Sequence, residues 1–217
     1  ETTSWFSAYW DFVADFLNHK YGKEWCLAAD QSLLKHVQNT SIPQQLLIKS
    51  PKGNNNPTPL PHETSLFNLK TDIPSDAFTI VMNGIRMYDL PSSLVYCSPR
   101  IYVTYSLDVR AALSMIRDAS EVLPVLLENG HTILAGRLAG AFRNIGREMI
   151  ADQIIETFKQ ADYDIREVDP FETNSKINIA TRERSPYTIR IRLLWQEMRK
   201  TTEGVGSSRR VPPWDVG

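Results

Sequence analysis

The stretch HTILAGRLAGAFRNIGREMIADQIIETFKQADYDI, residues 131–165, decides how the second half of this sequence folds. Its first part carries apolar side chains at helical spacing on one face: Leu134, Leu138, Ala141, Phe142 and Ile145. Gly136 and Gly140 fall nearly opposite that face. Each glycine inside a helix costs roughly 1 kcal/mol relative to alanine, and close approach of another helix is the usual compensation. The pattern therefore predicts a helix that is packed on both sides.

A second helix is expected after a turn at Asn144–Gly146. Gly146 stands where a residue with positive φ commonly ends a helix. Residues 147–161, REMIADQIIETFKQA, then return to helical spacing of apolar side chains. Residues 131–161 are therefore expected to form a helical hairpin.

The glycines do not form a phosphate-binding loop. A dinucleotide fingerprint needs G-x-G-x-x-G, and a P-loop needs G-x-x-x-x-G-K-[ST]. Gly136 and Gly140 are separated by Arg-Leu-Ala, no Lys-Ser or Lys-Thr pair follows them, and no strand is expected before them.

A DNA-binding helix-turn-helix is the alternative to a packed hairpin. Three arginines are available for phosphate contacts: Arg137, Arg143 and Arg147. The second helix, however, carries the acidic residues Glu148, Asp152 and Glu156, whereas a recognition helix should be basic and polar on its outer face. We favour the packed hairpin, in which the arginines either bind a partner or form salt bridges to carboxylates such as those of Glu148 and Asp152.

The rest of the sequence indicates an α+β fold, with a small, mostly antiparallel sheet and flanking helices followed by a helical half. Strand-like segments occur at 44–50, 65–70 and 78–82, and again after the Asn83-Gly84 turn signal. The proline-rich segment 51–63 is expected to be a surface loop, and 163–168 a final strand. Helical spacing of apolar residues marks these segments: 4–21, 30–37, 91–97, 106–119, 120–130 and 187–200.

Three parts follow from this pattern. Residues 1–90 hold the first helix and the sheet, residues 91–200 form a mainly helical region packed on it as one unit, and residues 201–217 form a flexible tail or linker. The first residues, ETTSWF, lack an initiator Met, so the sequence is expected to begin inside a longer chain.

Composition narrows the classes of function. The net charge of −1 gives no global basic field for nucleic acid, although residues 182–210 are locally basic and include Arg190 and Arg192. No apolar run is long enough to span a membrane, and none has the order of a secretory signal. Cys26 and Cys97 lie far apart without a CxxC partner, which favours buried free thiols and a cytoplasmic protein.

No catalytic or metal-binding motif is recognisable. The histidines form neither H-x-x-x-H nor HExxH spacing, and no G-x-S-x-G occurs: His19, His36, His62 and His131. We therefore expect this chain to act without a catalytic residue, a metal or a cofactor of its own; the third alternative is a small enzyme with a carboxylate site that no motif marks.

Two segments resemble known families. EWCLAADQSLLKHVQNTSIPQQLLIKSPKGNN, followed by TSLFNLK, resembles the core domain of AbiEi-type abortive-infection antitoxins. With residues 117–171 added, the sequence is similar to the N-terminal region that precedes the catalytic domain in a subgroup of bacterial Fic proteins. The resemblance covers about residues 5–200.

The resemblance implies a regulatory module rather than an enzyme. Fic enzymes transfer AMP through the motif HPFxxGNGR, and none of the four histidines here precedes Pro-Phe. The inhibitory motif [ST]xxxE[GN] of that family also fails, because Arg199 stands four residues before Glu203. AbiEi-type antitoxins bind operator DNA through a winged helix that would precede this sequence.

We therefore expect a non-catalytic, antitoxin-like binding module of a toxin-antitoxin or phage-defence system. Its partner would be a protein, either a toxin or the catalytic domain of its own Fic-type parent, with no membrane. The candidate binding residues are five arginines: Arg137, Arg143, Arg147, Arg190 and Arg192. The alternative is a DNA-binding regulator of such an operon that uses the 133–161 hairpin or the basic C-terminal helix.

Overall fold

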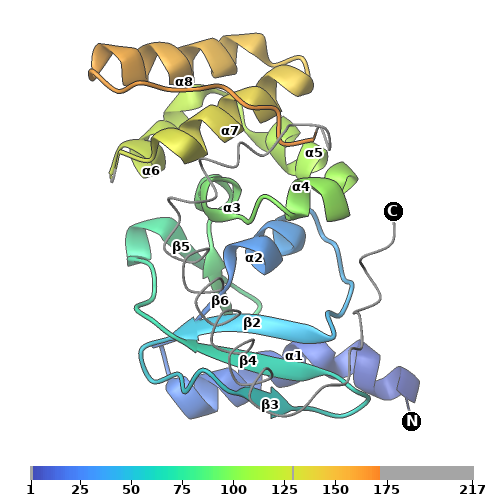
Figure 1. Ribbon diagram of the computed structural model, residues 1–217. Helices are drawn as coiled ribbons and strands as arrows, with labels where there is room; N and C mark the ends of the chain where they lie inside the picture. The colour runs from blue at the N-terminus through green and yellow to red at the C-terminus, as the bar shows by residue number, and fades with distance from the viewer. Residues whose placement is uncertain (1, 129, 172–217) are drawn as a thin grey trace, which may run out of the picture. The chain divides into compact units, whose positions relative to one another are not determined.

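The computed structural model describes residues 2–128 and 130–171, with side chains from residue 4 onward (Figure 1). All of the described residues lie within one compact unit. Helices and two small sheets make the fold α+β, as the sequence predicts. The helix expected at 187–200, the tail at 201–217, Arg190 and Arg192 lie outside the described residues.

Helix α1 (Thr2–Tyr21) supports the larger sheet. The sheet has the order β1-β2-β4-β3, from β1 (Cys26–Leu27), β2 (Gln45–Ser50), β4 (Ser65–Lys70) and β3 (Pro57–Pro59). Figure 1 shows α1 running along these strands. Side chains from one face of β2 and β4 pack with the apolar stripe of α1 and with Trp25, which precedes β1, into one core: Tyr9, Val13, Leu17, Trp25, Leu46, Ile48 and Leu66.

The central pair of this sheet is parallel. β2 and β4 pair in parallel from Gln45↔Ser65 to Ser50↔Lys70, whereas β1 and β3 pair antiparallel with their neighbours. The expected surface loop at 51–63 is partly wrong, because residues 57–59 form the edge strand β3. Proline lacks an N–H, so it is tolerated where one side of a strand has no partner.

A β-hairpin forms the second sheet. β5 (Thr79–Met82) follows the short 3-10 helix η1 (Asp76–Phe78) and pairs antiparallel with β6 (Ile85–Tyr88). Asn83 and Gly84 both have positive φ, 50° and 74°. This is the turn that an Asn-Gly pair favours, as the sequence predicts.

Short helices build the second core. They are α2 (Ala29–His36), α3 (Leu90–Tyr96), α4 (Ile101–Thr104), α5 (Ser106–Met115), η2 (Ala119–Glu121), α6 (Leu123–Leu127), α7 (Thr132–Asn144) and α8 (Glu148–Gln160). α2 contributes Leu33 and Leu34 to this helical core, and it also contacts β6. No helix in the described residues is long and apolar enough to cross a membrane.

The α7–α8 hairpin is confirmed, and Gly146 between the helices has φ 76°. The strand expected at 163–168 is wrong. Residues 163–169, here called the strap, run without strand pairing across α7, and the Val168 N–H donates to the Gly136 carbonyl oxygen at 3.2 Å.

The strap, rather than a neighbouring helix, explains why glycine occupies positions 136 and 140. A methyl group built at Gly136 would lie 2.1 Å from the Arg166 carbonyl oxygen, and one at Gly140 would lie 2.2 Å from that of Val168. The close neighbour of α7 at these positions is therefore the extended strap rather than another helix. Apolar spacing could not reveal this, because the strap meets the helix through its own backbone.

Candidate functional site

Arg137 holds the C-terminal end of α3. Its Nη2 donates to the Cys97 carbonyl oxygen at 2.8 Å and to that of Val95 at 3.3 Å. The guanidinium carbon also lies 5.8 Å from the Tyr102 ring centroid. A cation near the last carbonyls of a helix satisfies them and complements the helix dipole.

Arg147 does the same for α5. Its Nη2 donates to the carbonyl oxygens of Ile116 and Arg117 at 2.9 and 3.0 Å. Ile116 is the C-cap residue of α5. Arg147 itself precedes α8, so this contact fixes the start of α8 against the end of α5.

Arg143 ties the strap to the hairpin. Its Nε and Nη2 donate to the two carboxylate oxygens of Glu167 at 2.7 and 3.1 Å, and Nη2 also donates to Asp152 at 2.6 Å. Hydrogen bonds to Glu167 and then Asp152 raise the pKa of Arg143 above its ordinary value. The salt bridge to Asp152 is one of the alternatives that the sequence offered for these arginines.

All three described arginines of the candidate site therefore make intramolecular contacts. They do not gather at one surface pocket, and each has partners on a different element. The exposed side of α8 carries Glu148, Asp152 and Glu156, an acidic face that opposes contact with phosphates. Binding of a partner through these arginines stays a prediction.

An exposed apolar ridge lies on α4 and α5. Val103, Leu107 and Met115 have 54%, 80% and 50% of their surface exposed, and Ala111 between them is also exposed. The opposite side of α5 supplies Val109, Ala112 and Leu113 to the helical core. The four exposed residues are named the ridge below.

The spacing of the ridge residues is visible in the sequence, although the apolar pattern predicts only a helix at 106–119 and no exposed apolar surface on it. Leu107, Ala111 and Met115 recur every four residues, and Val103 continues the series backward. This second apolar stripe lies beside the core-facing stripe of the same segment. When a helix has two apolar stripes and one of them faces the core, the other is either covered by a second neighbour or exposed to solvent.

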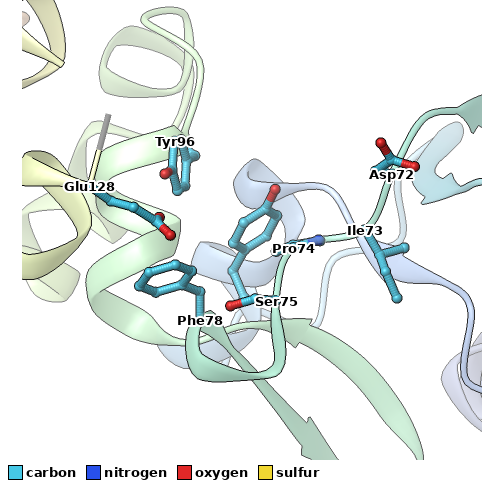
Figure 2. Close-up of a pocket in the computed structure, with 8 residues that line it drawn as sticks. Asp72, Ile73, Pro74, Ser75, Phe78, Tyr96 and Glu128 are labelled. Carbon is cyan, nitrogen blue, oxygen red and sulfur yellow. The ribbon is translucent and has the colours of Figure 1, made fainter. Parts of the chain in front are cut away.

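A small acidic and aromatic cavity of about 220 Å³ lies between the 72–78 segment, β6, α3 and the end of α6 (Figure 2). Its walls carry three rings, Phe78, Tyr88 and Tyr96. The carboxylates of Asp72 and Glu128 also line it. The remaining lining residues are Ile73, Pro74 and Ser75.

Three hydrogen bonds hold Tyr88 in the wall of this cavity. Its N–H donates to Ser32 Oγ at 3.2 Å, and its carbonyl oxygen accepts from His36 Nε2 at 2.9 Å. Its hydroxyl oxygen accepts from Lys49 Nζ at 2.8 Å. Burial, followed by the nearby Cys26, raises the pKa of the Tyr88 hydroxyl.

A second cavity of about 370 Å³ shares Tyr96 with the first and is lined in part by Leu47, Lys49 and Asp30. The Asp30 carboxylate accepts from both the N–H and the hydroxyl of Ser98, each at 2.6 Å. Asp30 therefore fixes the segment after α3 to α2, and it has a structural partner.

Both cysteines are free and buried, as predicted. Burial raises the pKa of Cys26 to about 12 and that of Cys97 to about 11, so both thiols stay protonated at neutral pH and are poor nucleophiles. Within residues 2–128 and 130–171, no group of three His, Cys, Asp or Glu side chains is placed to hold a metal ion.

No family model matches this sequence, and neither a curated protein nor a solved structure matches it. The resemblance to AbiEi-type antitoxins and to Fic N-terminal regions therefore stays a prediction.

Proposed function

We propose that this chain is a regulatory, antitoxin-like binding module that recognises a protein partner through the ridge on α4 and α5. The observation that carries the proposal is the exposure of Leu107 and Met115 on one side of α5, whose other side is core, together with the exposed Val103 on the preceding α4. Apolar side chains at spacings of four are the anchors with which a helix enters an apolar groove of another protein.

The chemistry of the ridge favours a protein over DNA. Val, Leu, Ala and Met offer no donor to a phosphate, and flexible methionines adapt to irregular apolar surfaces. The arginines that a DNA-binding hairpin would use bind carbonyl oxygens and carboxylates within the protein. The partner surface that fits the ridge is an apolar groove, as on a toxin or on the catalytic domain of a longer parent.

The test is titration calorimetry between the purified full chain and the purified product of the adjacent gene, or the downstream domain if the open reading frame continues. Wild type is expected to bind, and Leu107→Glu with Met115→Glu is expected to weaken binding by at least about a hundredfold, because a charge would be buried without a partner. Ile133→Glu is the matched control, since Ile133 is 72% exposed on another helix.

Equal binding by the ridge variant and wild type would overturn the proposal. A second arm uses a duplex of the gene's own promoter at low salt. Steeply salt-dependent binding that is lost on charge reversal at Arg143 and Arg147, without any protein partner, would instead establish the DNA-binding alternative.

A further inference from the structure

We propose that the cavity lined by Phe78, Tyr88, Tyr96 and Glu128 binds an organic cation of side-chain size, the guanidinium of an arginine or the alkylammonium of a lysine. This site lies apart from the ridge and goes beyond the proposed protein contact. It would recognise a charged side chain by its chemistry, whichever molecule presents it.

The aromatic walls are the first reason. The rings of Tyr88 and Tyr96 have centroids 5.7 Å apart with an interplanar angle of 46°, so they form two adjoining walls rather than one stack. Figure 2 shows the Phe78 ring facing the same space. The faces of aromatic rings attract cations, and several rings around one space are how proteins hold ammonium groups.

The carboxylates are the second reason. Figure 2 shows the Glu128 carboxylate between the rings of Tyr96 and Phe78, with Asp72 at the other end of the cavity. Among the described residues neither Glu128 nor Asp72 forms an ion pair. Two carboxylates repel an anion, and a carboxylate beside aromatic faces offers a guanidinium or ammonium both charge and hydrogen-bond acceptors.

Size and rigidity are the third reason. A volume of about 220 Å³ is below the range of about 300–1,000 Å³ that suits drug-sized ligands, so the cavity fits a head group. Tyr88 is 3% exposed and is held by Ser32, His36 and Lys49, which keeps one wall in place before a ligand arrives.

Lys49 and His131 lie beside the tyrosine rings. Lys49 Nζ donates to the Tyr88 hydroxyl oxygen at 2.8 Å and lies 5.3 Å from the ring centroid, so its charge lies at the hydroxyl end of the ring and leaves the ring face open. His131 packs edge-on against Tyr96 with centroids 5.7 Å apart. The charge of Lys49 repels a cation at Tyr88, and this repulsion limits the affinity that the cavity can reach.

The experiment uses the full chain and four small probes. N-acetyl-arginine amide and N-acetyl-trimethyllysine amide carry the two cations, N-acetyl-citrulline amide is the neutral counterpart of the first, and N-acetyl-norleucine amide tests apolar binding. Aromatic-ring NMR shifts are followed in wild type, Glu128→Gln, Tyr96→Leu and Glu156→Gln. The last variant makes the same exchange at an exposed carboxylate on α8.

The expected result is saturable binding of a cationic probe by wild type and Glu156→Gln. Glu128→Gln and Tyr96→Leu should each weaken it by about tenfold, and citrulline should bind at least about tenfold more weakly than arginine. Which cation binds tighter distinguishes guanidinium from ammonium as the ligand. Absence of binding by both cations, equal binding of citrulline, or unchanged affinity in Glu128→Gln would overturn the proposal, whatever the result at the ridge.

Discussion

α7 and α5 are both amphipathic helices of the same core, but they differ in what covers their outer sides. α7 is closed by the core on one side and by the strap on the other, and Gly136 and Gly140 are buried under strap backbone. α5 has core contacts on one side, while Leu107 is 80% exposed on the other. The arginines of the hairpin, which suggest binding in the sequence, make internal contacts, whereas α5 carries a row of exposed apolar side chains, Leu107 and Met115 among them.

The largest expected effect comes from Gly140→Ala. If the strap were loose, alanine would stabilise α7 by up to about 1 kcal/mol through helix propensity. In the structure the new methyl group would lie 2.2 Å from the Val168 carbonyl oxygen, so we expect a loss of about 3 kcal/mol in the free energy of unfolding. Urea unfolding measures it.

Whether Gly140→Ala lowers or raises the free energy of unfolding decides whether the strap covers α7. Ala111→Gly on the exposed side of α5 is the matched reverse exchange, and it should cost only about 1 kcal/mol from propensity. A more stable Gly140→Ala protein would show that the strap does not cover the helix.

Arg137→Met is expected to have the next largest effect. The substitution keeps an apolar stem but leaves the carbonyl oxygens of Cys97 and Val95 without this donor, which should lower the free energy of unfolding by about 2 kcal/mol. Lys159→Met on the exposed side of α8 is the control, with an expected change within about 0.5 kcal/mol. Equal stability of the two variants would remove the structural role assigned to Arg137.

The difference between α7 and α5 also marks what the sequence could and could not predict. Apolar spacing predicted both helices, and Gly146 and the Asn83-Gly84 pair predicted the two turns, because these features depend on local residue types. The parallel pairing of β2 with β4, the strap and the carbonyl partners of Arg137 and Arg147 could not be predicted. They join segments distant in the chain through backbone atoms, which every residue type shares.

The candidate cavity shows the same limit. Phe78, Tyr88, Tyr96 and Glu128 come from η1, β6, α3 and the turn after α6, and no spacing rule connects them. Only the packing of β6 against α2 and of α6 near α3 brings these side chains around one space. The ridge, by contrast, is local, and its spacing of four was visible in the sequence.

Alkaline pH should lower the free energy of unfolding through the two buried thiols, Cys26 and Cys97. Burial first, and then Asp30, raises the pKa of Cys97 from 9.0 to about 11, although Arg137 lowers it, and burial raises that of Cys26 from 9.0 to about 12. Below pH 8 both thiols are protonated in the folded and unfolded states, so this contribution to stability is complete. Above pH 9 only the unfolded chain releases these protons, and the free energy of unfolding should fall between about pH 9 and 11.

Urea unfolding at a series of pH values measures this slope. Cys97→Ala should make the decline shallower than in wild type, whatever its effect at pH 7. An unchanged slope would show that Cys97 ionises as easily in the folded protein as in the unfolded chain.

The smallest expected effect on stability, and the largest on binding, comes from the ridge. Leu107→Glu and Met115→Glu place charges where the side chains are already 80% and 50% exposed, so the free energy of unfolding should change by less than about 0.5 kcal/mol. A loss of more than about 2 kcal/mol in urea unfolding would show that the ridge is covered within the protein, as α7 is. Unchanged stability together with lost partner binding would show that the two helices have different roles. The outer contacts of α7 would stabilise the fold, and the exposed side of α5 would bind another molecule.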